Sequence, residues 1–348
     1  MTTANLSPVS ERAQAPDRLP VLPATEGLSW RALTPGDVPA WYALVSTVEE
    51  HDDAVERSSE RDLADVFKGT WRDPARDSVG GFDAQGRLRA FARSEFEPVT
   101  AGTLAPILFG AVHPEYRRRG IGRALIEWSE ARARQQLGAV DSSLPARIRV
   151  FTDDHHMGAK ALAESTGFTP LRWYVEMRRD LAQPLPGVNP AEGIRIEGYS
   201  AERDEEVRVT HNESFARDHW GSSPISAESW QLQVINTEGF RPDWSFVAYD
   251  TATGGVVGYT LASAYKQDWE AQGFSEGWTD LLGVRREYRG RGIAGALLAA
   301  SMAAFAESGI EYAGLDVDTE NPTGALGAYT RLGYDRCRTG VLYAKELS

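Results

Sequence analysis

"VHPEYRRRGIGRALIEW" (112–128) and "VRREYRGRGIAGALLAA" (284–300) are two versions of one motif, and their first loop arginines, Arg117 and Arg289, are 172 residues apart. In each version a strand-like apolar run ends at a valine, a short Arg/Gly segment follows, and apolar residues then recur at helical spacing. A period of this length repeats a whole domain rather than a solenoid unit. We therefore predict that the chain contains two copies of one domain.

The Arg/Gly segments have the composition of an anion-binding loop. Glycine lets the backbone approach a ligand closely, and amides at a helix N-terminus attract phosphate. Arginines add charge-assisted hydrogen bonds. The spacing is neither that of a Walker loop, because no G-K-[ST] is present, nor G-x-G-x-x-G. We predict pyrophosphate binding by Val112, Arg117, Arg118, Arg119, Gly120, Ile121 and Gly122 in the first copy and by Val284, Arg289, Gly290, Arg291, Gly292, Ile293 and Ala294 in the second.

Both loops match the R/Q-x-x-G-x-G/A pattern, and on this basis the chain resembles the GNAT family of acyl-CoA-dependent N-acetyltransferases over nearly its whole length. The tandem layout is similar to that of the group that includes mycothiol synthase. The resemblance implies that acetyl-CoA is the co-substrate, with its pyrophosphate on the loop and its acyl arm between two splayed strands. It also implies direct transfer to the amine of a small molecule, with no acyl-enzyme.

Further landmarks recur in the same order in both copies, and each copy reads as β-α-α-β-β-β-α-β-α-β. This pattern predicts a mixed α/β (α+β) fold whose sheet is mostly antiparallel and flanked by helices. We predict a disordered, Pro/Ser/Ala-rich tail at 1–27, an N-terminal domain at 28–181, a Pro/Gly-containing linker at 182–193 and a C-terminal domain at 194–348. Each domain is expected to end in its own closing strand.

Composition limits the possible partners and compartment. The net charge of −13 argues against nucleic acid as a general partner, and no apolar run of 18 residues predicts a membrane span. The single cysteine, Cys337, and the lack of a signal-peptide pattern favour a reducing cytoplasm. The tandem repeat can take the place of a homodimer, which favours a monomer.

The last helix of each copy distinguishes the two domains. Family members commonly use a tyrosine there as the acid that protonates the departing CoA thiolate. "NPTGALGAYTRLGY" (321–334) has Tyr329 at that position, and Asn321 is expected to hydrogen-bond the pantetheine arm or the loop backbone. The first copy has Ala163 in place of the tyrosine, so we predict that the N-terminal domain is catalytically silent.

Two carboxylates are candidates for the general base in the second copy. Glu276 and Asp280 are four residues apart in a predicted strand and would share one face. Family members that carry a base in this strand have it at the position of Trp278. Asp280 ranks first because it lies deeper in the strand. The alternative interpretation is that Glu276 caps a turn and Asp280 is a solvated or hydrogen-bonded side chain.

The acceptor site is expected between the first helices of the second copy and the opposing strands. Asp218, His219 and Trp220, with His211 and Phe215, combine aromatic surface with hydrogen-bonding groups suited to a polar amine. A helix C-terminus packed by the same aromatic residues is the alternative. Asp316, in the strand before Asn321, is a further acceptor-binding candidate.

No metal is expected. The run "DDHH" (153–156) reads as a solvated turn, because adjacent residues seldom converge on one ion. Two other functions remain open: a non-catalytic acyl-CoA-binding or sensing protein, and a protein or peptide N-acetyltransferase.

Overall fold

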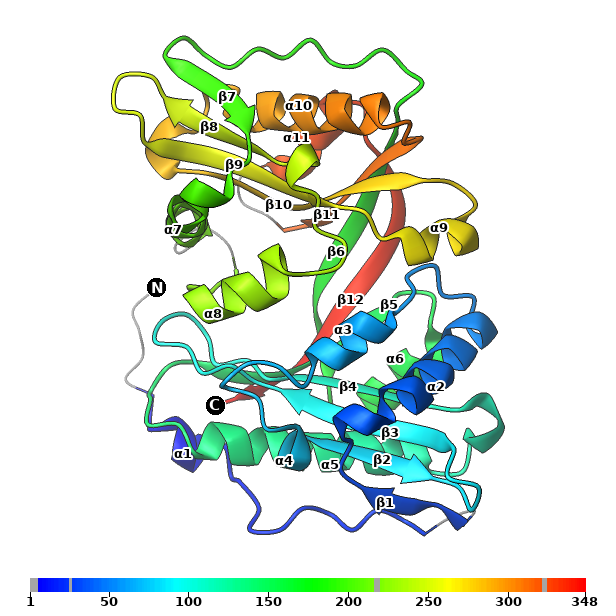
Figure 1. The fold of residues 1–348 in the computed structure, drawn as a ribbon. Coiled ribbons are helices and arrows are strands. Elements are labelled where there is room, and N and C mark those ends of the chain that lie inside the picture. Colours follow the sequence, from blue (N-terminus) through cyan, green and yellow to red (C-terminus); the bar gives the residue numbers. More distant parts are fainter. Residues whose placement is uncertain (1–5, 25–26, 216–219, 321–323) are drawn as a thin grey trace. The chain divides into compact units, whose positions relative to one another are not determined.

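A computed structural model describes residues 6–24, 27–215, 220–320 and 324–348. The chain forms two compact units, one of residues 1–172 together with 340–348 and the other of residues 173–339 (Figure 1). Within the described ranges no helix is both long and apolar enough to cross a bilayer. Asn321 and the pair Asp218 and His219 lie outside the described residues.

The first unit is a six-stranded sheet in the order β1 (Ser29–Arg31), β2 (Ser78–Phe82), β3 (Leu88–Glu95), β4 (Ile107–Val112), β5 (Ala146–Asp153) and the end of β12 (Asp335–Leu347). Only the β4–β5 pair is parallel. The helix α5 (Ile121–Gly138) covers one face, and α2 (Val38–His51) and α3 (Glu60–Asp65) cover the other (Figure 1). The short helices α4 (Pro74–Asp77) and α6 (Met157–Ser165) complete this unit.

The prediction of a disordered tail over 1–27 is wrong for residues 6–24. The helix α1 (Val9–Arg12) buries Val9 and Ala13 completely in the core beneath α5. The Arg12 guanidinium donates to the carbonyl oxygens of Leu347 (2.6 Å) and Leu144 (2.6 Å). Composition missed this segment because a few anchoring residues, rather than its average hydrophobicity, determine whether it packs.

The second unit repeats the arrangement with the strand order β6 (Thr169–Asp180), β11 (Tyr312–Asp318), β10 (Glu276–Val284), β9 (Val256–Ser263), β8 (Phe246–Asp250) and β7 (Ile194–Gly198). The helix α10 (Ile293–Glu307) lies on one face, and α7 (Asp204–Phe215) lies on the other (Figure 1). The remaining helices are α8 (Ala227–Trp230), which continues as a π-helical turn (Gln231–Ile235), α9 (Lys266–Gln272) and α11 (Ala325–Arg331).

The closing strand of each unit comes from the other sequence repeat. Strand β6 ends the first repeat, but its residues from Tyr174 to Asp180 pair antiparallel with β11. Strand β12 ends the second repeat, but its residues from Gly340 to Leu347 pair antiparallel with β5. The expectation that each repeat would close its own sheet is therefore wrong, because the two closing strands are exchanged between the repeats.

Candidate active site

The Arg/Gly loop of the second unit connects β10 to α10. Gly290 and Gly292 have φ angles of +75° and +73°, in the left-handed region that L side chains disfavour. Gly292 is the N-cap of α10, so the amides that follow it are the ones that have no acceptor within the helix. These donors and the positive end of the helix form a site for a phosphate group.

The first unit builds the same loop between β4 and α5. Gly120 is the N-cap of α5 with φ +82°, and Arg118 takes the left-handed conformation (φ +63°) that Gly290 takes in the other copy. Arg118 is exposed, as are Arg119 and Gly120. Both loops therefore present the backbone geometry expected of a pyrophosphate site.

The first arginine of each loop braces the loop rather than pointing to solvent. Arg289 donates from Nε to the Val284 carbonyl oxygen (3.2 Å) and from Nη2 to the Ser214 carbonyl oxygen (2.8 Å). Arg117 donates in the same way to Val112 (3.0 Å) and forms a bidentate pair with Asp52 (2.6 and 2.7 Å), which lowers the pKa of that carboxyl. These two side chains hold the loop against the preceding strand and helix.

The third arginine of each loop makes a contact of its own. Arg291 donates to the carbonyl oxygen of Glu192 (3.1 Å), and Arg119 donates to that of Glu115 (2.8 Å). The linker residue Glu192 thus lies against the second loop.

In both units the two parallel strands at the loop diverge. Strands β10 and β11 pair only from Glu276–Tyr312 to Thr279–Leu315, although β10 continues to Val284. Strands β4 and β5 pair only at Ile107–Arg149 and Leu108–Val150. The backbone N–H and C=O groups of β10 that follow Thr279 and point toward β11 thus face the opening between the strands, as binding of an extended pantetheine arm requires.

Asp280 lies at the point of divergence, in a β-bulge. Thr279 pairs with Ala262 and Leu281 with Leu261, so Asp280 is an extra residue without a partner position on β9. The bulge interrupts the two-residue alternation of β10. The Asp280 carboxylate still binds Ser263, which lies opposite Trp278, so it reaches the face that carries Glu276 and Trp278. Strand β4 pairs with β3 through six consecutive residues without a bulge.

The Asp280 side chain is half-buried, and its carboxylate accepts two hydrogen bonds. Ser263 Oγ donates to Oδ2 (2.5 Å), and the Tyr265 hydroxyl donates to Oδ1 (2.6 Å). Burial raises the pKa of Asp280 to about 6, against the opposing effect of the two hydrogen bonds. A carboxylate with this pKa is ionised at neutral pH and basic enough to accept a proton.

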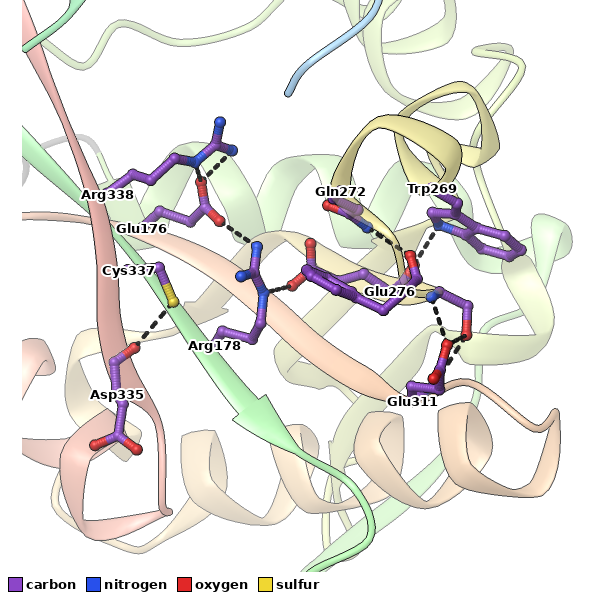
Figure 2. Close-up of polar contacts among 11 residues, drawn as sticks. Glu176, Arg178, Trp269, Gln272, Glu276, Glu311, Asp335, Cys337 and Arg338 are labelled. Atoms are coloured by element: carbon purple, nitrogen blue, oxygen red, sulfur yellow. Dashed lines mark hydrogen bonds and ion pairs between the residues drawn. The ribbon is translucent and has the colours of Figure 1, made fainter. Parts of the chain in front are cut away.

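Glu276 is held in an ion-pair chain (Figure 2). Its Oε1 accepts from Arg178 Nε (2.7 Å), and Arg178 Nη2 donates to Glu176 Oε1 (2.8 Å). Glu176 Oε2 in turn accepts from Arg338 Nε (2.7 Å). Burial raises the pKa of Glu276, and the hydrogen bond and charge of Arg178 oppose this rise.

Tyr329 lies on α11 and packs against the core of the second unit. Its ring centroid is 6.2 Å from that of Tyr334, and burial raises the pKa of Tyr329 to about 12. The phenol is therefore protonated at neutral pH. Ala163, its counterpart on α6, is buried in the core of the first unit and carries no ionisable group.

The remaining candidate residues are distributed as follows. Asp316 is exposed on β11, opposite Glu176 of β6, and Trp220 is half-buried in a turn. The atoms of Asp153, His155 and His156 that could bind a metal lie within 4.8 Å of one another, although adjacent residues of this turn were not expected to converge on one ion. The absence of a metal stays a prediction.

Sequence reasoning missed five residues around the candidate bases: Ser263, Tyr265, Glu176, Arg178 and Arg338. Ser263 is the last residue of β9, and Tyr265 lies two residues beyond it. The sequence predicted a hairpin that ends at Ser263, so the proximity of both residues to the next strand could have been anticipated. The other three come from β6 and β12, which the sequence assigned to the ends of two separate domains.

The paired strand–loop–helix sites on splayed sheets define an acyltransferase of the acyl-CoA-binding class. Family models agree: an "Acetyltransferase (GNAT) family" model matches residues 40–168, and an "Acetyltransferase (GNAT) domain" model matches residues 242–336. The chain belongs to the GNAT family and carries two GNAT domains, which confirms the predicted fold class and tandem repeat.

Curated relatives carry one common name. The mycothiol acetyltransferase of Salinispora tropica is 30% identical over 269 residues, which cover 75% of this chain and 78% of the relative. The mycothiol acetyltransferase of Thermobispora bispora is 28% identical over 314 residues, or 90% and 97% of the two chains. Together with the family models, they support assignment of this protein as an acetyltransferase.

Solved structures share the fold across nearly the whole chain. A GCN5-related N-acetyltransferase from Sphaerobacter thermophilus has a TM-score of 0.70 and 26% identity, covering 94% of this chain and 97% of that one. A tandem GNAT protein from the clavulanic acid biosynthesis pathway has a TM-score of 0.63 and 18% identity, covering 92% and 99%. The latter similarity concerns the fold alone.

Proposed function

We propose that the protein is an acetyl-CoA-dependent N-acetyltransferase that acetylates the primary amine of a small molecule by direct attack on the thioester. The observation that carries this proposal is the half-buried Asp280 carboxylate at the bulge where β10 and β11 diverge. It combines a pKa of about 6 with a position beside the opening that would hold the acyl arm.

The chemistry can be assigned to this chain's own groups. The amine gives up a proton to Asp280, and its nitrogen lone pair forms a bond to the thioester carbonyl carbon. The carbon–sulfur bond then breaks, and the electron pair leaves with the CoA sulfur. Tyr329, which is protonated because its pKa is about 12, donates a hydrogen bond and then a proton to that sulfur. The nitrogen, which starts as an ammonium, loses its second proton as the amide forms, and this proton restores the Tyr329 phenol.

We assign catalysis to the second unit. The first unit has the loop and the diverging strands, but Ala163 stands in place of the tyrosine and β4 lacks the bulge that carries Asp280. Asn321, Asp218 and His219 stay candidates for cofactor and acceptor binding from the sequence. The monomeric state and the cytoplasmic location are likewise proposals.

The name shared by these relatives suggests which acceptor to test first. Because they are named mycothiol acetyltransferase, we propose cysteinyl-glucosaminyl-inositol as the first acceptor in a panel that also contains simple amines, amino sugars and N-terminal peptides.

The test is thiol release from acetyl-CoA in the presence of each member of the panel, with the acetylated product identified by mass. We expect turnover with a small-molecule amine. Turnover with peptides alone would identify a protein N-acetyltransferase, and CoA binding without turnover on any amine would identify a sensor. Either result would overturn the proposal.

A further inference from the structure

The ion-pair chain around Glu276 joins three strands of the second unit: β10 carries Glu276, β6 carries Arg178 and Glu176, and β12 carries Arg338 (Figure 2). The side chains of Glu176 and Glu276 are only 6% and 8% exposed. Such buried carboxylates are costly unless they are paired. The chain of ion pairs therefore holds these charged side chains in one arrangement.

A glycine lets Arg178 reach Glu276 across an intervening strand. In the sheet, Arg178 lies opposite Gly314 of β11, and Gly314 lies opposite Trp278 of β10. A Cβ atom on Gly314 would come within 2.4 Å of the Trp278 ring and 2.8 Å of Glu276 Cδ. Directly opposed residues project to the same face of a sheet. Because Gly314 has no side chain on that face, the Arg178 side chain can extend from β6 over β11 to Glu276 on β10.

The same face of the sheet carries the Asp280 carboxylate. Gly277, between Glu276 and Trp278, has its hydrogen toward Phe305 of α10, so Glu276 and Trp278 project to the face opposite α10. Ser263, which binds Asp280, pairs directly with Trp278 and projects to the same face. The exposed Asp316 lies opposite Glu176. The Arg178 guanidinium is stacked over the Phe274 ring at 4.3 Å, which restrains its orientation.

We propose that Arg178 is a positioning residue for the acceptor: it holds Glu276 as an anion whose Oε2 binds the acceptor ammonium beside Asp280. This inference rests on the proposed function. It divides the work between the two carboxylates, with Glu276 binding the amine and Asp280 accepting its proton. It also means that the last strand of the first repeat supplies part of the active site of the second.

Several titratable groups surround Glu276. Arg178 and Arg338 lower its pKa, while Glu176 and burial raise it. Cys337 of β12 and Tyr334 after α11 are also within electrostatic range. Since the hydrogen bond from Arg178 is the largest effect that lowers the pKa, its removal will leave Glu276 protonated up to a higher pH.

The test compares Arg178→Met and Arg178→Lys with the unaltered protein, measuring kcat and KM for the amine from pH 6 to pH 9. The ratio of variant to unaltered KM at each pH removes the titration of the amine itself. For Arg178→Met we expect the KM ratio to be about tenfold at pH 6 and to fall to about twofold at pH 9, because loss of the charge-assisted hydrogen bond leaves Glu276 protonated at the lower pH. The kcat and the KM for acetyl-CoA should stay within about twofold, and Arg178→Lys should restore much of the amine KM.

Arg132→Met is the matched control, because Arg132 forms a buried pair with Asp77 in the first unit (2.7 Å). It should lower the melting temperature without a pH-dependent amine KM. A KM ratio for Arg178→Met that is the same at every pH, or an unchanged KM, would overturn the inference while leaving the proposed function in place. A fall in kcat alone would make Glu276 the base and overturn it too. Absence of turnover by the unaltered protein would overturn both proposals.

Discussion

At the scale of single residues, the proposed acid and the proposed base of the second unit lie in different surroundings. Tyr329 packs among apolar side chains, which disfavours its phenolate. Asp280 is equally removed from water, but two hydroxyl donors partly compensate its charge. The result is a phenol that stays protonated and a carboxylate that titrates near neutrality.

Tyr329→Phe tests the acid. Loss of the hydroxyl should lower kcat about 100-fold, because general acid catalysis contributes about 100- to 10,000-fold. The KM for acetyl-CoA should change little. Thiol release at saturating substrates measures the effect. Tyr343→Phe, which removes a hydroxyl bonded to Glu164 in the first unit (3.0 Å), should leave kcat unchanged. Equal activity of Tyr329→Phe and the unaltered protein would reject the assignment.

Asp280→Asn tests the base through its pH dependence. The carboxylate must be ionised to accept a proton, and its pKa is raised to about 6. In the unaltered protein kcat/KM should therefore fall about tenfold per pH unit below pH 6, beyond any fall caused by the acceptor's own titration. The Asn variant should be much slower at neutral pH and should lack this additional fall. If its profile keeps the same acid limb, another group is the base.

At the scale of elements, the two loops have the same backbone shape, and in each the first arginine ties the loop to its surroundings. Arg289 donates to the carbonyl oxygens of Val284 and Ser214, and Arg117 donates to Val112 and forms a bidentate pair with Asp52. The strands that precede the two loops also differ by one residue, since β10 contains a bulge and β4 does not. The copies therefore share the backbone geometry of the Arg/Gly loop and differ at the bulge that carries Asp280.

Arg289→Met and Arg117→Met form a matched pair that asks which loop serves catalysis. Charge-assisted hydrogen bonds are worth about 1.5–3 kcal/mol, so release of the second loop should raise the KM for acetyl-CoA about tenfold or more. Arg117→Met should leave the steady-state constants unchanged, because its loop belongs to the unit without the acid. Initial rates at varied acetyl-CoA provide the measurement. The opposite ranking would assign catalysis to the first unit.

At the scale of the whole molecule, the repeats of the sequence and the units of the structure differ by one strand each. The unit boundaries fall within β6 and β12, so each unit contains chain from both repeats. Two fragments cut in the linker would each lack a strand that its own sheet needs. This arrangement makes the folding of each unit depend on an intact chain.

Removal of residues 340–348 tests this dependence. The segment buries Val341, Leu342, Tyr343 and Leu347 in the first unit. At about 2 kcal/mol for each buried side chain the loss is about 8 kcal/mol, comparable with the whole stability of a domain at about 5–15 kcal/mol. We expect the first unit to unfold while the second keeps a thermal transition, as seen by calorimetry and limited proteolysis. A truncated chain with an unchanged melting profile would show that the exchanged strand is dispensable.

The sequence by itself determined the tandem α/β fold, both anion-binding loops and the difference between Tyr329 and Ala163. These features depend on local patterns: apolar periodicity, glycines at left-handed positions and the residue type at a fixed spacing. Only the tertiary structure decided which strands close each sheet, where the bulge places Asp280 and that Arg178 reaches Glu276 over Gly314. The closing strands and the Arg178–Glu276 contact depend on pairing between segments about 100 residues or more apart, and the bulge depends on the register of the neighbouring strands β9 and β10. No local pattern encodes which of two similar strands completes a given sheet edge. The packed N-terminal segment escaped prediction for a related reason, since Arg12 is fixed by the carbonyl of Leu347 at the other end of the chain.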